Sequence, residues 1–312
     1  MPSIAVSVVI ATRDRPALLR AALGAVGRGL RPGDEVIVVD SASRPPAAAA
    51  VADVAAEAGA RLVRCERPGT SRARNAGARA ATAAIVAFTD DDCLPEPGWL
   101  QAVAGAFERH PELGFLTGAV EPGRRADGTA PTGVTLSTMT GGASRAFGAE
   151  EDPDALGHGA NMAWDRAALV GIGGFDEAFG PGAPLRAAED HEAFWRALRT
   201  GLAGRHEPTA TVVHSQWRDT CGQMRSYYGY GVGAGGLFVK RGRMEAGLPT
   251  VGAYLWARGV APIGRTLSKG YERGAAAEAA KLAGMVHGVL RSRRLEVAGA
   301  TFSVDRHGSR RP

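Results

Sequence analysis

Several features that mark other classes of protein are rare or absent in this sequence. Only three cysteines occur, Cys65, Cys93 and Cys221, and none has CxxC spacing. The odd number argues against a disulfide framework and favours a reducing, cytoplasmic location. No apolar run approaches the ~18 residues of a membrane-spanning helix. No basic segment precedes the first apolar run, so we expect no cleaved signal peptide.

Lysine is scarce as well, because only Lys240, Lys269 and Lys281 occur among 312 residues. The net charge of +5 comes almost entirely from arginine, and the chain is also rich in alanine and glycine. This bias is typical of GC-rich coding sequences, so we expect no nucleic-acid partner. Hydrophobic residues at 45% and charged residues at 22% are typical of a folded globular chain.

The glycine-rich loops that cradle phosphates are missing too. The segment after the first apolar run, residues 12–16, reads TRDRP and lacks the GxGxxG pattern of dinucleotide-binding folds. No GxxxxGK[ST] motif occurs elsewhere. If the protein binds a diphosphate, we expect a metal ion to neutralise its charge.

What the sequence does contain is an alternation of strand-like and helix-like segments. The strand-like runs are apolar on both faces, as parallel strands covered by helices are. Strands are predicted at 7–11, 35–39, 61–64 and 84–88, and helices at 16–26, 47–58, 70–81 and 97–109. The pattern predicts an α/β fold that begins with βαβ units.

The second half of the chain is less regular. Residues 121–158 are rich in glycine, serine and threonine, and we interpret them as loops and short strands on the acceptor side of a cleft. We expect order again at 161–170, a helix at 189–199, a strand at 210–214 and helices within 224–294. The predicted division is a domain at 1–220 with halves 1–120 and 121–220, a helical extension at 221–300 and a disordered tail at 301–312.

Three adjacent carboxylates, Asp90, Asp91 and Asp92, follow the predicted strand at 84–88. Adjacent carboxylates repel each other unless a cation offsets their charge, and oxygen ligands suit Mg²⁺ or Mn²⁺. Ligands of open α/β sheets bind beyond the carboxyl ends of the strands. The alternative is a solvated acidic turn that caps the next helix. We favour a metal site.

Other polar residues have both a structural and a functional interpretation. Asp40 ends the strand at 35–39, where it can bind a ribose or a base or simply start a turn. Glu189 and Asp190 open a helix, where acids stabilise the helix dipole or supply a general base. His214 ends a β-branched run, and it is no better a metal ligand in isolation than three other histidines, His158, His191 and His206.

Taken in order, these segments resemble the family 2 glycosyltransferases, which are inverting enzymes with the GT-A fold. The resemblance covers roughly residues 5–217, and the ordered set is more specific than any single motif. The matching segments are SVVIAT at 7–12, VVDSAS at 38–43, ARNAG at 73–77, FTDDD at 88–92, GGFD at 173–176 and ED at 189–190. The resemblance implies a mostly parallel, mixed sheet flanked by helices, with a C-terminal helical extension.

The resemblance also implies roles for single residues. It places the nucleotide-binding residues at Thr12, Asp14, Asp40, Arg74, Asp90 and Asp91. Among them, Asp40 would bind the base or ribose, Arg74 would lie near the base or diphosphate, and Asp90 would contact ribose or a metal-bound water. Asp92 would be the direct metal ligand, and His214 matches a histidine that completes the metal site in some relatives. Asp190 resembles the catalytic base.

The implied reaction uses Mg²⁺ or Mn²⁺ and a UDP-, GDP- or dTDP-sugar as donor. A hydroxyl of a glycan, lipid-linked sugar or natural product would be the acceptor, and Asp190 would remove its proton. The Gln-x-x-Arg-Trp signature of processive synthases is absent, because Gln216, Trp217 and Arg218 stand in a different order. We therefore expect transfer of a single sugar.

Three rival interpretations remain open at this stage. A nucleotidyltransferase also uses a metal at an acidic strand end, but it usually has a basic, glycine-rich loop after its first strand. A scaffold protein with a decayed nucleotide-sugar site would be expected to lose its carboxylates first, yet they are present. A third possibility is a module peripheral to the inner face of the membrane, because arginines and lysines are spread through residues 254–294.

Overall fold

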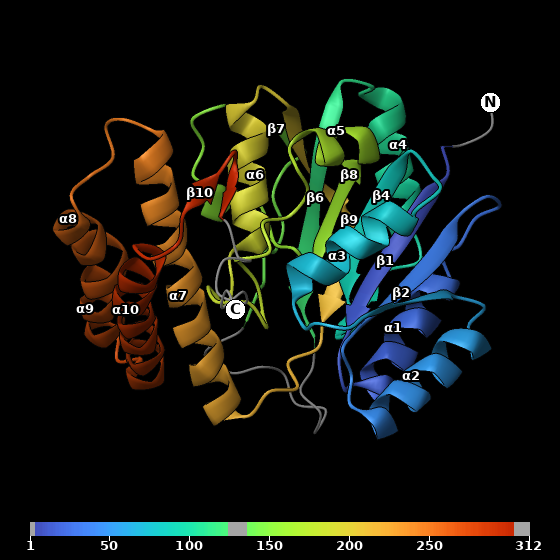
Figure 1. Cartoon of the computed structure of the whole chain (residues 1–312), viewed down its shortest axis with the longest axis horizontal. Helices are drawn as coiled ribbons and strands as arrows, with labels where there is room; N and C mark the ends of the chain where they lie inside the picture. Colours follow the sequence, from blue (N-terminus) through green and yellow to red (C-terminus); the bar gives the residue numbers. More distant parts are fainter. Residues whose placement is uncertain (1–3, 124–135, 303–312) are drawn as a thin grey trace, which may run out of the picture.

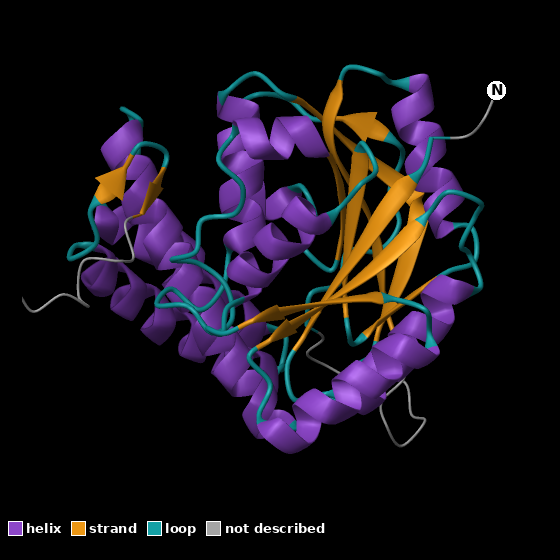
Figure 2. Cartoon of the chain, turned by 45° about the vertical axis from the view of Figure 1, so that its right-hand side comes forward, coloured by secondary structure: helices purple, strands orange, loops and turns teal. Residues whose placement is uncertain are grey.

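A single mixed sheet forms the centre of the protein, and helices cover both of its faces (Figures 1 and 2). The structure is a computed structural model that describes residues 4–123 and 136–302. The sheet has nine strands in the order β3-β2-β1-β4-β8-β6-β9-β5, and β7 pairs with β9. The predicted α/β class is confirmed.

The first half of the sheet is parallel, as the continuous apolar runs predict. β2 and β4 flank β1, and β3 lies at the edge. The elements are β1 (Val6–Thr12), α1 (Pro16–Gly27), β2 (Glu35–Ser41), α2 (Pro45–Glu57), β3 (Arg61–Cys65), α3 (Thr70–Ala80) and β4 (Ile85–Asp90). β4 runs two residues beyond the predicted end at 88, through Thr89 to Asp90, so the first carboxylate of the triplet belongs to the strand itself.

The second half of the sheet is mixed. β8 is antiparallel to both β4 and β6, whereas β6 and β9 are parallel to each other. Its elements are β5 (Cys93–Pro95), α4 (Trp99–Arg109), β6 (Leu113–Pro122), β7 (Arg145–Ala146), η1 (Pro153–Ala155), β8 (Asn161–Asp165), α5 (Arg166–Gly171), α6 (Glu189–Arg199) and β9 (Ala203–His214). β9 begins seven residues before the predicted strand at 210–214.

Buried apolar residues gather on both faces of the sheet. Alternate residues of β1 point to opposite sides, so Val8 packs with α1 and α4 on one face, whereas Val9 packs with α3 and α6 on the other. This double burial explains why the parallel strands are continuous apolar runs. The sheet is therefore a rigid platform for the residues at its strand ends.

A layer of helices follows the sheet domain (Figure 1). It contains α7 (Thr220–Met244), α8 (Val251–Leu255), the short π-helix η2 (Trp256–Val260), α9 (Ala261–Ser268), α10 (Glu272–Ser292) and the hairpin of β10 (Val297–Ala298) and β11 (Thr301–Phe302). α7 and α10 approach closely, because Gly231 and Gly235 face the backbone of α10, and Gly284 and Gly288 face that of α7. None of the described helices is long and apolar enough to span a bilayer.

The described parts of the irregular region confirm that regular structure is sparse there. Residues 136–158 hold only the two-residue strand β7 and the short turn η1. Residues 124–135 of this region, and residues 303–312 of the predicted tail, lie outside the described part of the chain.

Candidate active site

A cleft of about 630 Å³ opens where the strands β1 and β4 end. The parallel register brings Ala11 of β1 beside Asp90 of β4, and Thr12 beside Asp40 of β2. Six of the predicted site residues line the cleft: Thr12, Arg74, Asp90, Asp92, Asp190 and His214. They come from β1, α3, β4, the following turn, α6 and β9.

Asp91 points away from the cleft into the protein. Its carboxylate accepts a hydrogen bond from the Thr12 hydroxyl at 2.6 Å and pairs with Arg15 at 2.8 Å. Burial raises the pKa of Asp91 to about 7, although the positive charge of Arg15 opposes the shift. Asp91 thus holds the loop after β1 against the turn after β4.

Asp92 is buried at the floor of the cleft among positive and hydrogen-bonding groups. Its Oδ2 accepts a hydrogen bond from Trp217 Nε1 at 2.8 Å and lies 3.4 Å from Arg15 Nη1 and 3.5 Å from Arg218 Nη1. Its Oδ1 lies 3.5 Å from His214 Nε2. Burial alone would raise the pKa of Asp92, but His214 and the two arginines lower it well below its usual range.

His214 is oriented by a backbone carbonyl on its other side. Its Nδ1 lies 2.8 Å from the oxygen of Leu136, so Nδ1–H is the donor and Nε2 faces Asp92. Burial acts to lower the pKa of His214, but the Asp92 carboxylate outweighs it and raises the pKa. A ring held in this way by a partner on the far nitrogen is typical of histidine ligands of metals.

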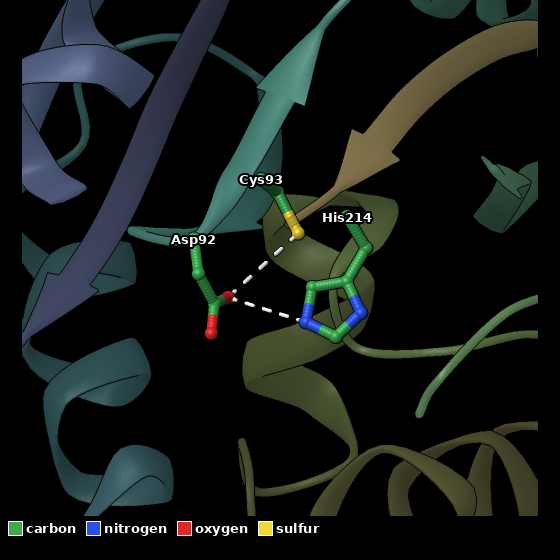
Figure 3. Close-up of side chains that lie close together, drawn as sticks. All are labelled: Asp92, Cys93 and His214. Carbon is green, nitrogen blue, oxygen red and sulfur yellow. Dashed lines mark hydrogen bonds and ion pairs between the residues drawn. The ribbon is translucent and has the colours of Figure 1, made fainter. Parts of the chain in front are cut away.

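The donor atoms of Asp92, Cys93 and His214 lie within 4.8 Å of one another (Figure 3). A carboxylate oxygen and an imidazole nitrogen suit Mn²⁺, and Mg²⁺ is commonly bound by one or two carboxylates, waters and substrate phosphates. Burial raises the pKa of the Cys93 thiol well above its usual value, and a neutral thiol is a poor ligand for these ions. Asp92 and His214 therefore fit a metal of this class.

Arg74 joins the end of β4 to α6. Its guanidinium is buried and donates to Asp90 Oδ1 at 2.9 Å, to Glu189 Oε1 at 2.7 Å and to the carbonyl of Gly159 at 3.0 Å. Gly159 has no room for a side chain, because an added Cβ would lie 2.7 Å from Arg74 Nη1. A planar guanidinium spreads five N–H donors over a rigid fork, so it can reach fixed acceptors on separate elements, whereas the donors of a lysine all lie on one nitrogen.

Asp190 lies in the first turn of α6, and this helix begins directly after Ala188, which has a left-handed backbone with φ of 65°. The backbone N–H of Gly159 donates to Asp190 Oδ2 at 2.6 Å. Burial would raise the pKa of Asp190, but the charges of His191 and Arg74 outweigh it and lower the pKa. The carboxylate is therefore ionised at neutral pH and able to accept a proton.

His191 carries positive charge next to Asp190. Its Nδ1 lies 3.0 Å from Asp154, and its Nε2 has no hydrogen-bond partner among the described residues. Burial opposes protonation, yet the two neighbouring carboxylates raise the pKa of His191 to about 10. His158 joins the same cluster, and its donor atom lies within 4.8 Å of those of Asp190 and His191.

Asp14 and Asp40 do not line the cleft. Asp40 is buried, accepts a hydrogen bond from the N–H of Ser43 at 2.9 Å and pairs with Arg64. Asp14 accepts from the N–H of Arg44 at 2.8 Å and has φ of 56°. Both carboxylates organise the loops after β1 and β2, and their predicted contacts with a nucleotide stay predictions.

Sequence reasoning missed several residues of the cleft. Arg15 and Arg218 surround Asp92, and the extension contributes Tyr227, Tyr230 and Lys281 to the wall. Arg15 and Arg218 stand close in the sequence to Thr12 and His214, and this proximity could have identified them as residues of the cleft. No pattern in the sequence indicates that α7 and α10 reach the cleft.

Comparisons with known proteins show which family the chain resembles. Residues 7–146 match the model of glycosyl transferase family 2. A pre-mycofactocin glycosyltransferase of Mycobacterium tuberculosis is 30% identical over 305 residues, which covers 93% of this chain and 57% of that protein. A glucosyl-dolichyl phosphate glucuronosyltransferase of Haloferax volcanii is 28% identical over 111 residues, or 36% of each chain. The chain thus spans just over half the length of the mycobacterial relative.

Solved structures with a similar fold include a mannosyltransferase and the protein TarS. The mannosyltransferase PcManGT from Pyrobaculum calidifontis, in complex with GDP-Man and Mn²⁺, has a TM-score of 0.60 at 22% identity, and the match covers 91% of this chain and 86% of that one. TarS 1–349 of S. aureus has a TM-score of 0.53 at 14% identity and covers 96% of each chain. The protein therefore contains a family 2 glycosyltransferase domain and has the GT-A fold.

Proposed function

We propose that the protein transfers one sugar from a nucleotide-diphosphate-sugar to an acceptor hydroxyl, with the help of a divalent metal and with inversion at the anomeric carbon. The observation that carries this proposal is one cleft that contains both Asp92 with His214 and Asp190. Asp92 and His214 fit a metal ion, and Asp190, on α6, is an ionised carboxylate. The match to glycosyl transferase family 2 favours sugar transfer as the reaction that needs both a metal ion and a carboxylate base.

On the donor side, Asp92 and His214 would hold Mg²⁺ or Mn²⁺. The metal, when bound, offsets the negative charge that develops on the departing nucleoside diphosphate. Thr12, Asp90 and Arg74 line the same part of the cleft, and we propose that they and the loops held by Asp14, Asp40 and Asp91 bind the nucleotide. PcManGT was solved with GDP-Man and Mn²⁺, which supports a donor of this kind.

On the acceptor side, Asp190 takes the proton of the attacking hydroxyl. The oxygen of that hydroxyl forms a bond to the anomeric carbon as the bond from this carbon to the diphosphate oxygen breaks. Because attack and departure occur on opposite faces, the configuration inverts in one step. The N–H of Gly159 and the charge of His191 keep Asp190 ionised before the proton arrives.

We propose the predicted domain division as the functional one as well. Residues 1–120 would bind the donor, 121–220 would supply the base and much of the acceptor side, and the extension at 221–300 would complete the wall through Tyr227, Tyr230 and Lys281. The acceptor is a hydroxyl of a glycan, a lipid-linked sugar or a natural product. The free state of all three cysteines agrees with a cytoplasmic location.

The test is release of nucleoside diphosphate from a panel of UDP-, GDP- and dTDP-sugars by the purified full chain, with Mn²⁺, with Mg²⁺ and with EDTA. We expect one donor to be hydrolysed slowly in a metal-dependent way. Asp92→Ala should abolish both this activity and metal-dependent nucleotide binding in calorimetry. Glu112→Ala, on an exposed turn, is the matched control and should behave as the wild type.

Asp190→Asn separates chemistry from binding. Once the donor is known, transfer to an acceptor should fall by roughly 10²- to 10⁴-fold, because a positioned general base contributes about that much. Calorimetric affinity for the donor with metal should stay within a few-fold of the wild type. If no donor is hydrolysed and calorimetry also detects no metal-dependent nucleotide binding, the transferase proposal is wrong and a scaffold role replaces it.

A further inference from the structure

The last long helix, α10, has two apolar faces. One face is buried against α7 and contains Gly284, Met285, Gly288 and Val289. The other is exposed and contains small and branched apolar residues at Ala276, Ala279, Ala283, Val286 and Leu290. A helix that packs on one side only is normally polar on the other, so the second face requires an explanation.

Helical geometry places the exposed residues on one stripe. Their spacings of three and four residues keep them within about a quarter of the helix circumference at 100° per residue. Val286 is 42% exposed and Leu290 is 55% exposed. The stripe lies opposite Met285, which is fully buried, so it faces away from the rest of the described chain.

The same part of the chain concentrates positive charge. Residues 251–294 contain eight arginines and lysines and two glutamates, a net charge of +6, although the whole chain carries only +5. Six of these basic residues are exposed and form no ion pair within the described ranges: Arg265, Lys269, Arg273, Arg291, Arg293 and Arg294. Exposed apolar side chains lie among them, including Leu267 at 53% and Tyr271 at 63%.

We propose that the outer face of α10, with the exposed basic residues around it, docks on an anionic lipid bilayer. A helix that carries an apolar stripe flanked by arginines is suited to lie in the plane of the membrane interface. Each basic residue near an anionic leaflet adds electrostatic attraction that salt screens. A second copy of the chain fits this face less well, because dimerisation would bring two segments of charge +6 together.

Docking in this orientation leaves the cleft open. Lys281 lines the cleft, and by helical geometry it lies on the opposite side of α10 from the exposed stripe. Figure 1 shows α8, α9 and α10 together at the end of the molecule away from β2 and α2. The sheet domain would therefore stand beside the membrane surface and would not be buried in it.

The proposal is tested by co-sedimentation of the full chain with vesicles, without any sugar donor, so that the result does not depend on catalysis. The vesicles are phosphatidylcholine alone, or phosphatidylcholine with about 30 mol% phosphatidylglycerol. We expect binding to the anionic vesicles only, weakened by salt. Val286→Glu with Leu290→Glu should reduce the bound fraction by at least about tenfold. Arg291→Gln with Arg294→Gln should reduce it by several-fold.

The matched control is Val170→Glu, because Val170 is 62% exposed on α5, in the sheet domain. This variant should bind vesicles as the wild type does. All replaced side chains are exposed, so thermal melts should show that each variant is folded. Equal binding of the double glutamate variant and the wild type would overturn the proposal. So would light scattering that shows a dimer disrupted by the same double variant, since the face would then bind a second copy.

Discussion

The protonation of His191 should contribute to the stability of the folded protein. It is held as a cation between Asp154 and the proposed base Asp190, with its pKa raised to about 10 from an ordinary value of 6.5. A raised pKa in the folded state means that protonation stabilises the fold. The stabilisation is complete below pH 6.5 and is lost as the pH rises from there to about 10.

We therefore predict that the stability gap between the wild type and His191→Gln depends on pH. The gap in the free energy of unfolding should be largest near pH 6.5 and should shrink steadily toward pH 10. Urea denaturation of both proteins at several pH values in this range measures it. A gap that stays constant over the range would show that His191 is not charged in the folded protein.

At the same scale, the sequence predicted which residues gather but not where every side chain points. Strand ends brought Thr12 and Asp90 to one edge, because parallel strands share the direction of their carboxyl ends. Direction along the strand does not reveal whether a carboxylate faces a cleft or a neighbouring arginine. Asp40 pairs with Arg64, and Asp91 pairs with Arg15. These pairs could not be predicted, because they depend on where the fold places the two arginines.

At the scale of elements, the contact between α7 and α10 depends on glycine. An added Cβ at Gly284 would overlap the carbonyl oxygen of Tyr228, and one at Gly235 would overlap that of Met285. Backbone cannot move aside as a flexible side chain can, so the helices would have to separate. This contact fixes the position of α10 relative to α7, and both helices contribute residues to the wall of the cleft.

Gly284→Ala should therefore lower the free energy of unfolding by about 2–3 kcal/mol, even though alanine favours helix formation. Gly264→Ala in α9 is the matched control, because no atom lies within 4 Å of its added Cβ. That variant should be neutral or more stable by up to about 1 kcal/mol. Denaturant unfolding compares the two. Similar stability of both variants would mean that the helices can part at little cost.

The elements that the sequence predicted best include the continuous apolar runs of β1 and β2 and the amphipathic helix α6. β1, β2 and α6 lie within two residues of their predicted bounds. β6 was not predicted, because Gly114 and Gly118 interrupt its apolar run. Gly118 is required by packing, since an added Cβ would overlap the carbonyl oxygen of Ala210. A glycine that is required by a contact with a distant part of the chain does not indicate a strand in the local sequence pattern.

At the scale of the whole molecule, one buried cation ties the helical layer to the sheet domain. Lys240 of α7 is fully buried, and its Nζ lies 2.6 Å from Asp176 and 2.5 Å from Glu192. Arg196 also pairs with Glu192 at 2.6 Å. Asp176 belongs to the GGFD segment and Glu192 follows the proposed base on α6. The extension is thus joined to the same elements that carry Asp190.

Lys240→Met should cost about 3–5 kcal/mol, because it leaves two buried carboxylates without their shared cation. The double variant with Asp176→Asn should recover part of this loss, since it removes a carboxylate together with its partner. Denaturant unfolding of the two variants beside the wild type measures both effects. A cost below about 1 kcal/mol for the single variant would show that the network contributes little to stability.

Asp176 has one further partner, and it comes late in the chain. The N–H of Phe302, 126 residues further on, donates to Asp176 Oδ2 at 2.8 Å, and the Phe302 ring stacks on Phe179. A ribosome makes a chain from its N-terminus, so the GGFD segment leaves the exit tunnel long before β11 exists. Until then the newly made domain carries a carboxylate whose last hydrogen bond is missing. Folding of this enzyme is therefore completed only after translation has passed the hairpin.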